Sequence, residues 1–281
     1  MDFEQFDQFP SVPANGQATL VTDKFLDRSI HAIVFKLGGT NFTKAMISNL
    51  QIRIDGKDIV PMITGANLQK LNSYDGLPND ATQLWFFFGD PTSQTIRGQH
   101  LGDLDLSIYR KPLELRLDIV GATAPTLEAW AVTNVPKLAM GIGYDALEAA
   151  QMRALVRTVL QPAGAVTRKS YGLNWGSSNG GRIRRVNYFH AALTAVEFKK
   201  NSITKHDDIP IALNNSVSAQ YARTPQTGLY CLDRIYDGNQ GEAETTVDAD
   251  GRAWNQQYAI STSGADTIDV YVDVHAAWPL L

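Results

Sequence analysis

Short apolar runs, either alternating with polar residues or uninterrupted, follow one another along the chain and are separated by Gly, Asn, Asp and Pro. In residues 113–120 leucine or isoleucine alternates with charged residues, which is typical of a strand with one buried and one solvated face. We expect strands in the first half near residues 18–22, 30–37, 46–54, 84–88, 113–120 and 127–133. This spacing favours a β-sandwich.

The same rhythm continues in the second half of the chain. There we expect strands near residues 156–160, 188–193, 195–199, 229–236, 257–262 and 267–275. Asp55-Gly56 predicts a tight hairpin, because a primed turn needs the positive φ that glycine adopts freely. The pattern therefore predicts an all-β protein.

Helical patterning is confined to two short segments. Residues 66–74 predict a helix inside a loop, with Gly76 just beyond as a stop. Residues 145–155 predict a second helix, in which Asp145 and Glu148 have the spacing of a capping box. We expect its apolar stripe to include Leu147 and Leu155, and we interpret this helix as the junction between two domains.

The two halves resemble each other at a shift of about 146 residues. The apolar positions that correspond are Ile47, Leu50 and Ile52 in the first half and Leu193, Val196 and Phe198 in the second. A loop helix, an aromatic strand and a Gly-Ala turn then follow in the same order in each half. A duplicated sandwich is our interpretation, with two unrelated domains as the alternative.

We therefore expect two tandem jelly-roll β-sandwiches on one chain. The expected boundaries are an N-terminal jelly roll at 1–137 with an arm at 1–11, a linker with a short helix at 138–154, and a C-terminal jelly roll at 155–281.

Composition excludes several classes of protein. Apolar residues make up 44% of the 281 residues, which is enough for a folded core, and the net charge of −4 gives no general attraction to nucleic acid. Cys231 has no partner in the chain, so we expect a buried thiol. The start of the chain lacks a signal-peptide pattern and no apolar run is long enough for a transmembrane helix, so we expect synthesis in a cytosol and only peripheral membrane contact.

Five stretches of the first half have a familiar form: VPANGQATL (residues 12–20), GGT (38–40), FTKAM (42–46), IDGK (54–57) and LNSYDG (71–76). Together they resemble the viral coat proteins of corticovirus-like, tailless bacteriophages with an internal membrane, and of related prophages. The resemblance is clearest over residues 10–135, and the second half matches by the order and length of its elements.

The resemblance implies a major capsid protein of the double jelly-roll lineage, made in the bacterial cytoplasm and located in the virion. It implies homotrimers whose six jelly rolls form a pseudo-hexagonal capsomer of an icosahedral shell above a lipid bilayer. The implied partners are neighbouring capsomers, penton or minor capsid proteins, and the internal membrane or its proteins, with no specific nucleic acid. It implies no cofactor and no catalytic residues. At least one relative uses structural calcium in its shell, but no ligand positions match here, which leaves the metal question open.

A carbohydrate-binding jelly roll, either lectin-like or a receptor-binding spike, is the alternative function. Its sequence basis is a set of tryptophans that would line a sugar platform: Trp130, Trp175, Trp254 and Trp278. Core or interface positions explain these residues more simply.

Motifs for metal binding are weak. The five histidines show neither HxH nor HExxH spacing, so we interpret them as structural or surface residues. Asp248 and Asp250, followed by Gly251, resemble the start of a calcium loop, but no glutamate follows at the required distance. A simple turn is the favoured interpretation, and the two aspartates stay as weak candidates.

Candidates for contact with the membrane or a neighbouring subunit lie at both ends of the chain and in one basic cluster. The bulky apolar residues near the termini are Phe3, Phe6, Phe9 and Trp278. Arg182, Arg184 and Arg185 form the densest basic cluster, which would face lipid phosphates or a neighbouring subunit. The alternative is a strand that points Arg182 and Arg184 into solvent.

Catalytic motifs are missing from the sequence. No Gly-x-Ser-x-Gly elbow occurs, and Gly38-Gly39-Thr40 lacks the lysine of a phosphate-binding loop. Asp207 and Asp208 are adjacent only in sequence, and neighbouring strand residues point to opposite faces. We expect a protein that is not an enzyme.

Overall fold

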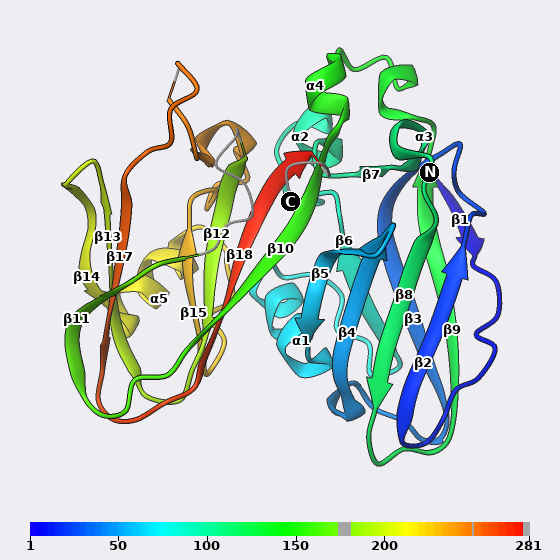
Figure 1. Ribbon diagram of the computed structural model, residues 1–281, viewed down its shortest axis with the longest axis horizontal. Helices are drawn as coiled ribbons and strands as arrows, with labels where there is room; N and C mark the ends of the chain where they lie inside the picture. Colours follow the sequence, from blue (N-terminus) through cyan, green and yellow to red (C-terminus); the bar gives the residue numbers. More distant parts are fainter. Residues whose placement is uncertain (174–180, 249, 278–281) are drawn as a thin grey trace. The chain divides into compact units, whose positions relative to one another are not determined.

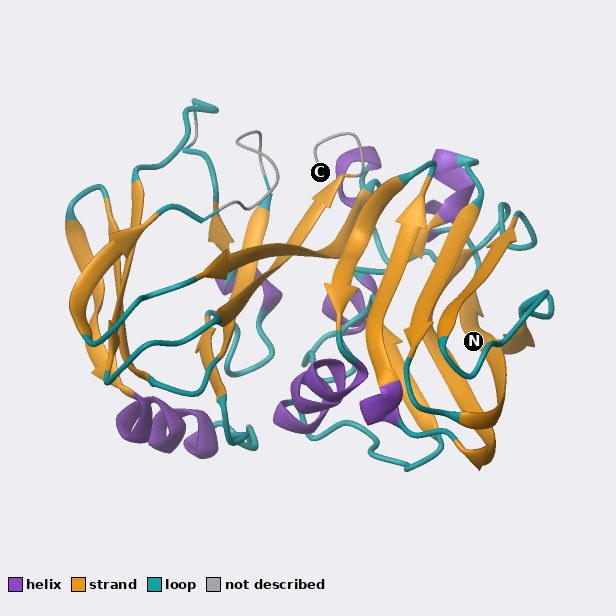
Figure 2. Cartoon of the chain, turned by 60° about the horizontal axis from the view of Figure 1, so that its bottom comes forward, coloured by secondary structure: helices purple, strands orange, loops and turns teal. Residues whose placement is uncertain are grey.

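The computed structural model describes residues 1–173, 181–248 and 250–277. The chain folds as two compact units, Met1–Ala154 together with residues 275–277, and Leu155–Val274. Each unit is built mainly from two β-sheets, with short helices in the connections (Figures 1 and 2). The expected all-β class is confirmed.

The first sandwich pairs its strands in the sheet orders β1-β9-β3-β6, with β7 beside β3, and β2-β8-β4-β5. Its strands are β1 (Asp2–Gln5), β2 (Gly16–Thr22), β3 (Ser29–Asn41), β4 (Ile47–Ile54), β5 (Lys57–Ile63), β6 (Gln83–Phe87), β7 (Leu104–Asp105), β8 (Leu113–Ile119) and β9 (Thr123–Asn134).

The second sandwich has the orders β10-β18-β12-β15, with β16 beside β12, and β11-β17-β13-β14. Its strands are β10 (Gln151–Leu160), β11 (Val166–Tyr171), β12 (Arg182–Phe189), β13 (Leu193–Lys200), β14 (Ile203–Pro210), β15 (Leu229–Asp233), β16 (Glu244–Thr245), β17 (Gln256–Thr262) and β18 (Ile268–Ala277).

Short helices occupy the connections. They are η1 (Lys44–Met46), α1 (Gly65–Tyr74), α2 (Ile96–His100), α3 (Leu106–Tyr109), η2 (Lys137–Ala139), α4 (Ala146–Ala149), α5 (Ile211–Gln220) and η3 (Gln240–Glu242). Among the described residues, no helix combines the length and apolar character needed to cross a bilayer.

The strand order of each unit is that of a jelly roll. In the first unit β1 pairs with β9, β2 with β8 and β4 with β5, so the chain folds back on itself as one long hairpin wrapped into two sheets. The second unit repeats this arrangement with β10-β18, β11-β17 and β13-β14 as the corresponding pairs. Two tandem jelly rolls, as expected, are confirmed.

The irregularities of the sheets repeat as well. Pairing of β4 with β8 shifts register between Ile47 and Asn49, and pairing of β13 with β17 shifts between Leu193 and Ala195, the same place 146 residues later. Both register shifts between β4 and β5 also recur, 146 residues on, between β13 and β14. Because bulges are specific local features, their repetition supports the duplicated-sandwich interpretation more strongly than the strand order alone.

The core of the first sandwich follows from the alternation in the sequence. The inward leucines and Ile119 of β8 are fully buried, whereas the charged residues between them are half-buried. The hairpin between β4 and β5 turns at Asp55 and Gly56, both at positive φ (49° and 81°), as the Asp-Gly signal predicts.

The second predicted helix is much shorter than expected. Asp145 and Glu148 do form a capping box, but α4 ends at Ala149 and strand β10 begins at Gln151. Leu147 is exposed and Leu155 lies in the strand, so the predicted apolar stripe was wrong. The residues after 150 pair with β18 as a strand, and this tertiary pairing outweighs the local helical pattern.

The N-terminal segment is not a free arm. Residues 2–5 form strand β1, at the edge of a sheet, with Phe3 opposite Val132 and Gln5 opposite Trp130. The expected arm at 1–11 is corrected accordingly, because this strand completes the first jelly roll.

Candidate functional site

Two of the five histidines, His31 and His100, come together at one place in the first unit, at the beginning of strand β3. His31 is the extra residue in a bulge of β3 against β9, since Ile30 pairs with Thr133 and Ala32 with Val132. The carbonyl of His31 accepts the N–H groups of two successive residues that follow β6. A bulge turns a side chain away from the regular alternation, and here it carries the imidazole toward the loop after α2.

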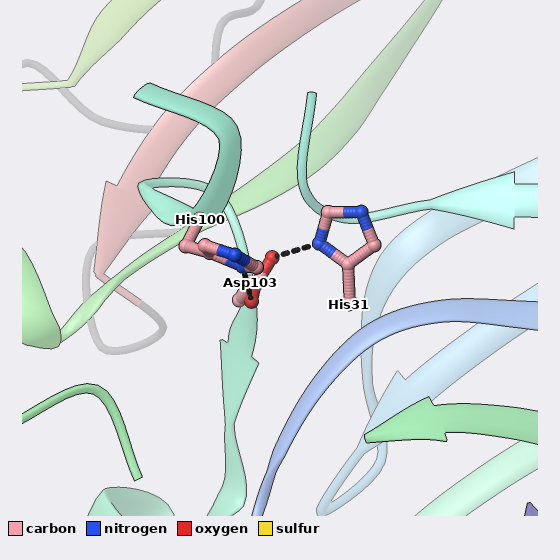
Figure 3. Close-up of side chains that lie close together, drawn as sticks. All are labelled: His31, His100 and Asp103. Atoms are coloured by element: carbon pink, nitrogen blue, oxygen red, sulfur yellow. Dashed lines mark hydrogen bonds and ion pairs between the residues drawn. The ribbon is translucent and has the colours of Figure 1, made fainter. Parts of the chain in front are cut away.

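Asp103 lies in that loop, just before β7, and is fully buried. Figure 3 shows its two carboxylate oxygens directed at two different imidazoles. Nδ1 of His31 lies 2.8 Å from Oδ1, and Nδ1 of His100, at the end of α2, lies 2.8 Å from Oδ2. At these distances each Nδ1–H donates to the carboxylate, so one aspartate holds two histidines that are 69 residues apart in sequence.

The surroundings of this cluster are tightly packed. A Cβ added to Gly89 would lie 2.2 Å from the ring of His31 and 2.4 Å from Asp103 Oδ1, so only glycine fits there. On another side the Asn134 amide nitrogen lies 3.5 Å from Asp103 Oδ2 and 3.4 Å from His100 Nδ1. The side chains of His31 and His100 are 7% and 11% exposed.

A buried lysine lies next to the cluster. The Nζ of Lys137 donates to the carbonyls of Leu101 and Gln151 and thereby joins the loop after α2 to the start of β10. Burial lowers the pKa of the Lys137 ammonium to about 8, although Asp103 and Asp105 act in the opposite direction. This end of the first sandwich is therefore held by buried polar bonds among segments that are distant in sequence.

Chemically, the cluster offers two imidazole nitrogens and one carboxylate whose ligand atoms all lie within 4.8 Å of one another. Among the described residues, no other group of three or more His, Cys, Asp or Glu side chains brings its ligand atoms close enough together to hold a metal ion. The interpretation of the five histidines as structural or surface residues did not anticipate that two of them lie together. The spacing of His100 and Asp103 was a local signal, whereas nothing in the sequence connects them to His31.

The basic cluster is not a surface site. Arg184 is 1% exposed, and its guanidinium contacts Asp273 at 3.2 Å and Gln240 at 3.0 Å. Arg185 is 3% exposed and pairs with Asp233 at 3.0 Å. The expected membrane or neighbour contact was wrong for both residues, and the alternative of a strand that points Arg184 into solvent was wrong as well, because buried aspartates from other strands pair with them. Arg182 is half-buried, and its contact role stays a prediction.

The aromatic residues at the N-terminus separate into two kinds. Phe6 and Phe9 are 3% and 8% exposed, and Phe6 packs edge-on against Phe25 with ring centroids 4.8 Å apart. They belong to the core, so their predicted role in membrane or neighbour contact is corrected. Phe3 is 55% exposed and stacks on Trp130, which leaves it free for a further contact. Trp278 lies outside the described residues.

The weak calcium candidates lie in a turn. One carboxylate oxygen of Asp248 accepts the backbone N–H groups of Asp250 and Arg252, at 2.9 and 2.8 Å, while Asp250 is exposed. This is the simple turn that the sequence favoured. Cys231 is buried, as expected.

Two of the four tryptophans proposed for a sugar platform can be placed. Trp130 stacks on Phe3 at a centroid distance of 5.2 Å, and Trp254 lies under the ammonium of Lys200 at 4.0 Å. Trp175 and Trp278 lie outside the described residues. The placed tryptophans have contacts within the chain that explain them without a sugar.

Two sandwiches with jelly-roll strand order on one chain define a double jelly-roll protein. A model of the viral coat protein P2 N-terminal domain matches residues 3–134, and a model of the viral coat protein P2 C-terminal domain matches residues 154–278. The chain therefore belongs to the viral coat protein P2 family, and it is a capsid protein. These matches support the capsid role and give no support to the carbohydrate-binding alternative.

Solved structures share the fold over the full length of the chain. The major capsid protein P2 from bacteriophage PM2 aligns with a TM-score of 0.78 at 19% identity, covering 99% of this chain and 97% of that one. A chain of Sulfolobus turreted icosahedral virus aligns at 0.66 and 11% identity, covering 99% and 91%. A chain of the PBCV-1 virus capsid aligns at 0.59 and 11% identity, covering 98% and 94%. No curated protein matches the sequence.

Proposed function

We propose that this chain forms homotrimeric capsomers that tile an icosahedral viral shell. The observation that carries the proposal is the presence of two complete jelly rolls, with the same strand order and the same bulges, in one member of a coat protein family. Three such chains present six similar sandwiches, so a threefold ring acquires a nearly hexagonal outline that packs in a lattice.

The outer faces of two sheets supply surfaces for lateral contact. On the sheet β2-β8-β4-β5, Arg53 forms ion pairs with Asp58 and Glu114 at 3.0 and 3.2 Å, and the side-chain amides of Asn49 and Gln17 donate hydrogen bonds to Asp118. Polar side chains that are already paired lose less hydration energy when a second wall covers them than unpaired charges do. These walls therefore suit repeated contact between identical copies.

The corresponding sheet of the second unit has the same character. Arg168 pairs with Asp207 at 3.0 Å and with Glu197 at 3.3 Å, and Lys199 pairs with Glu197 at 2.9 Å. A chain with two such walls can contact neighbours through either unit.

The protein is made in the cytoplasm of a bacterial host and is located in the virion, where it contacts neighbouring capsomers, penton or minor capsid proteins, and an internal membrane. Among the contact candidates that the structure describes, Phe3 is exposed and Arg182 is half-buried, so these two stay candidates. Its work is structural rather than catalytic, and the net charge of −4 argues against a specific role in binding the genome.

Sedimentation analysis of the purified chain tests the proposal. We expect a species of three times the chain mass of 30.9 kDa, together with larger assemblies under conditions that favour shells. Disruption of one wall by Arg53→Glu should reduce assembly while circular dichroism stays unchanged, and Lys36→Glu, at a separate exposed ion pair, is the matched control. A chain that stays monomeric at all concentrations would contradict the proposal.

A further inference from the structure

We propose that His31, His100 and Asp103 bind one divalent transition-metal ion of the Zn²⁺ or Co²⁺ type inside the first jelly roll. This site goes beyond the capsid role, because it lies within a single chain and does not depend on contact between copies.

The donor set selects the class of ion. Two imidazoles and one carboxylate favour zinc, cobalt, nickel or copper, whereas calcium and magnesium are held by oxygen ligands. The cluster has too few oxygens for a calcium site, so the expected ion differs from the calcium that the sequence resemblance suggests.

The geometry is close to what such an ion needs. The two Nδ1 atoms each lie 2.8 Å from an oxygen of the same carboxylate. An ion at about 2.0–2.2 Å from each ligand atom takes the place of the two hydrogen bonds, and the ligand atoms, which all lie within 4.8 Å of one another, shift to fit around it. In a neutral imidazole the single proton then moves from Nδ1 to Nε2, so each ring keeps its charge and no proton is lost.

The ligands are held in position before the ion arrives. A β-bulge directs His31, a buried loop carries Asp103, and the Gly89 backbone packs over their hydrogen bond. Low exposure of the two imidazoles limits competition from water. The Asn134 amide lies on one side of the cluster, where rotation of its side chain offers an oxygen as a fourth ligand.

The second jelly roll provides an internal comparison. At the position that corresponds to His31 it has Arg184, which pairs with the buried Asp273. A guanidinium stays protonated and does not bind metal. We therefore expect one ion per chain, in the first unit only.

Cobalt binding tests the proposal on the purified full-length chain after treatment with a chelator. One equivalent of Co²⁺ should produce visible d–d absorption, which one equivalent of Zn²⁺ abolishes and an equal amount of Ca²⁺ does not. His100→Gln changes the more exposed histidine of the cluster and should weaken Co²⁺ binding at least about tenfold. His206→Gln, in the second unit, is the matched control and should bind like the wild type.

Near-ultraviolet circular dichroism of both variants establishes that they are folded before metal is added. If His100→Gln loses its fold, the wild type still decides the question through the change of its histidine Nδ1 and Nε2 nuclear magnetic resonance shifts with Zn²⁺. Three results overturn the proposal: no d–d absorption from the wild type, equal binding by a folded His100→Gln variant, or displacement of Co²⁺ by Ca²⁺.

Discussion

The two jelly rolls place different chemistry at the same point of the same fold. In each unit the first two residues of a long strand pair with a two-residue strand, β7 or β16. The next residue is His31 in the first unit and Arg184 in the second, and each is bonded to an aspartate that is 0% exposed, Asp103 or Asp273. Backbone pairing fixes the position, whereas the side chain decides whether a guanidinium or an imidazole lies beside the buried carboxylate.

Strand β12 and its counterpart β3 are both buried on two faces, but they bury different residues. The first seven residues of β3 are buried and none of them is an arginine or lysine, whereas β12 buries Arg184 and Arg185. A strand with two buried faces has no solvated side for its charged residues, so its arginines need internal partners. The same backbone topology therefore accommodates either buried arginine–aspartate pairs or a histidine–aspartate cluster.

Removal of the buried partner of Arg184 should have the largest effect. Asp273→Ala leaves a guanidinium buried without its carboxylate, and we expect a loss of about 3–5 kcal/mol in the free energy of unfolding, measured by denaturant titration. Asp269 lies on the same strand as Asp273, and Asp269→Ala breaks a half-exposed ion pair with Arg157 of β10, so it should cost about 1 kcal/mol or less. Equal losses in the two variants would mean that Arg184 is not buried.

Phe6→Ala should destabilise the first sandwich by about 3 kcal/mol, because it empties a core position beside Phe25. The matched variant Phe3→Ala should cost about 1 kcal/mol or less, since Phe3 is exposed and loses mainly its stacking on Trp130. Thermal unfolding measures both. A larger effect at Phe3 than at Phe6 would restore the idea of a free N-terminal arm.

Asp103→Ala should cost about 2 kcal/mol, less than Asp273→Ala, because the two imidazoles it leaves behind can stay neutral. Native-state hydrogen exchange of the amides in β3 and β7 measures the loss. A loss of unfolding free energy as large as that of Asp273→Ala would show that each of the two variants leaves a cation buried without its carboxylate partner.

Acid should weaken the second sandwich through His206. Its Nε2 lies 2.6 Å from the hydroxyl of Tyr230, and burial lowers its pKa to about 4 from the usual 6.5. The unfolded chain therefore binds more protons between these values, so this contribution to stability is present above pH 6.5 and is lost as the pH falls to 4. The difference in unfolding free energy between wild type and His206→Gln should shrink by about 1–2 kcal/mol over this range, and a constant difference would contradict it.

The smallest predicted effect concerns a contact that both units share. Asn72 of α1 donates to the carbonyl of Trp85, and Asn214 of α5 donates to that of Cys231, each the third residue of the following strand. We expect about 1 kcal/mol from each change to alanine, and less from the neighbouring Asn215→Ala. Markedly unequal costs would mean that the two helices are not equivalent.

Much of the fold could be predicted from local signals. Alternation located β8, Asp55-Gly56 located a hairpin, and the 146-residue shift identified the corresponding strands. Local signals failed where distant segments decide the outcome. β1 has four residues and is a strand only because β9 lies beside it.

The site residues were harder to predict for the same reason. Arg184 and Arg185 look like surface residues until Asp273 and Asp233, which are 89 and 48 positions away, are brought beside them. His31 joins His100 only through a bulge and a buried carboxylate. Pairing across such separations follows from the assembled sheet and not from any local pattern.

Electron cryomicroscopy of assembled particles tests most directly whether one chain supplies two jelly rolls to a capsid lattice. We expect capsomers with threefold symmetry and six upright sandwiches, in which each chain can be traced through two of them. Capsomers in which each chain contributes a single sandwich, or a lattice without threefold capsomers, would contradict it.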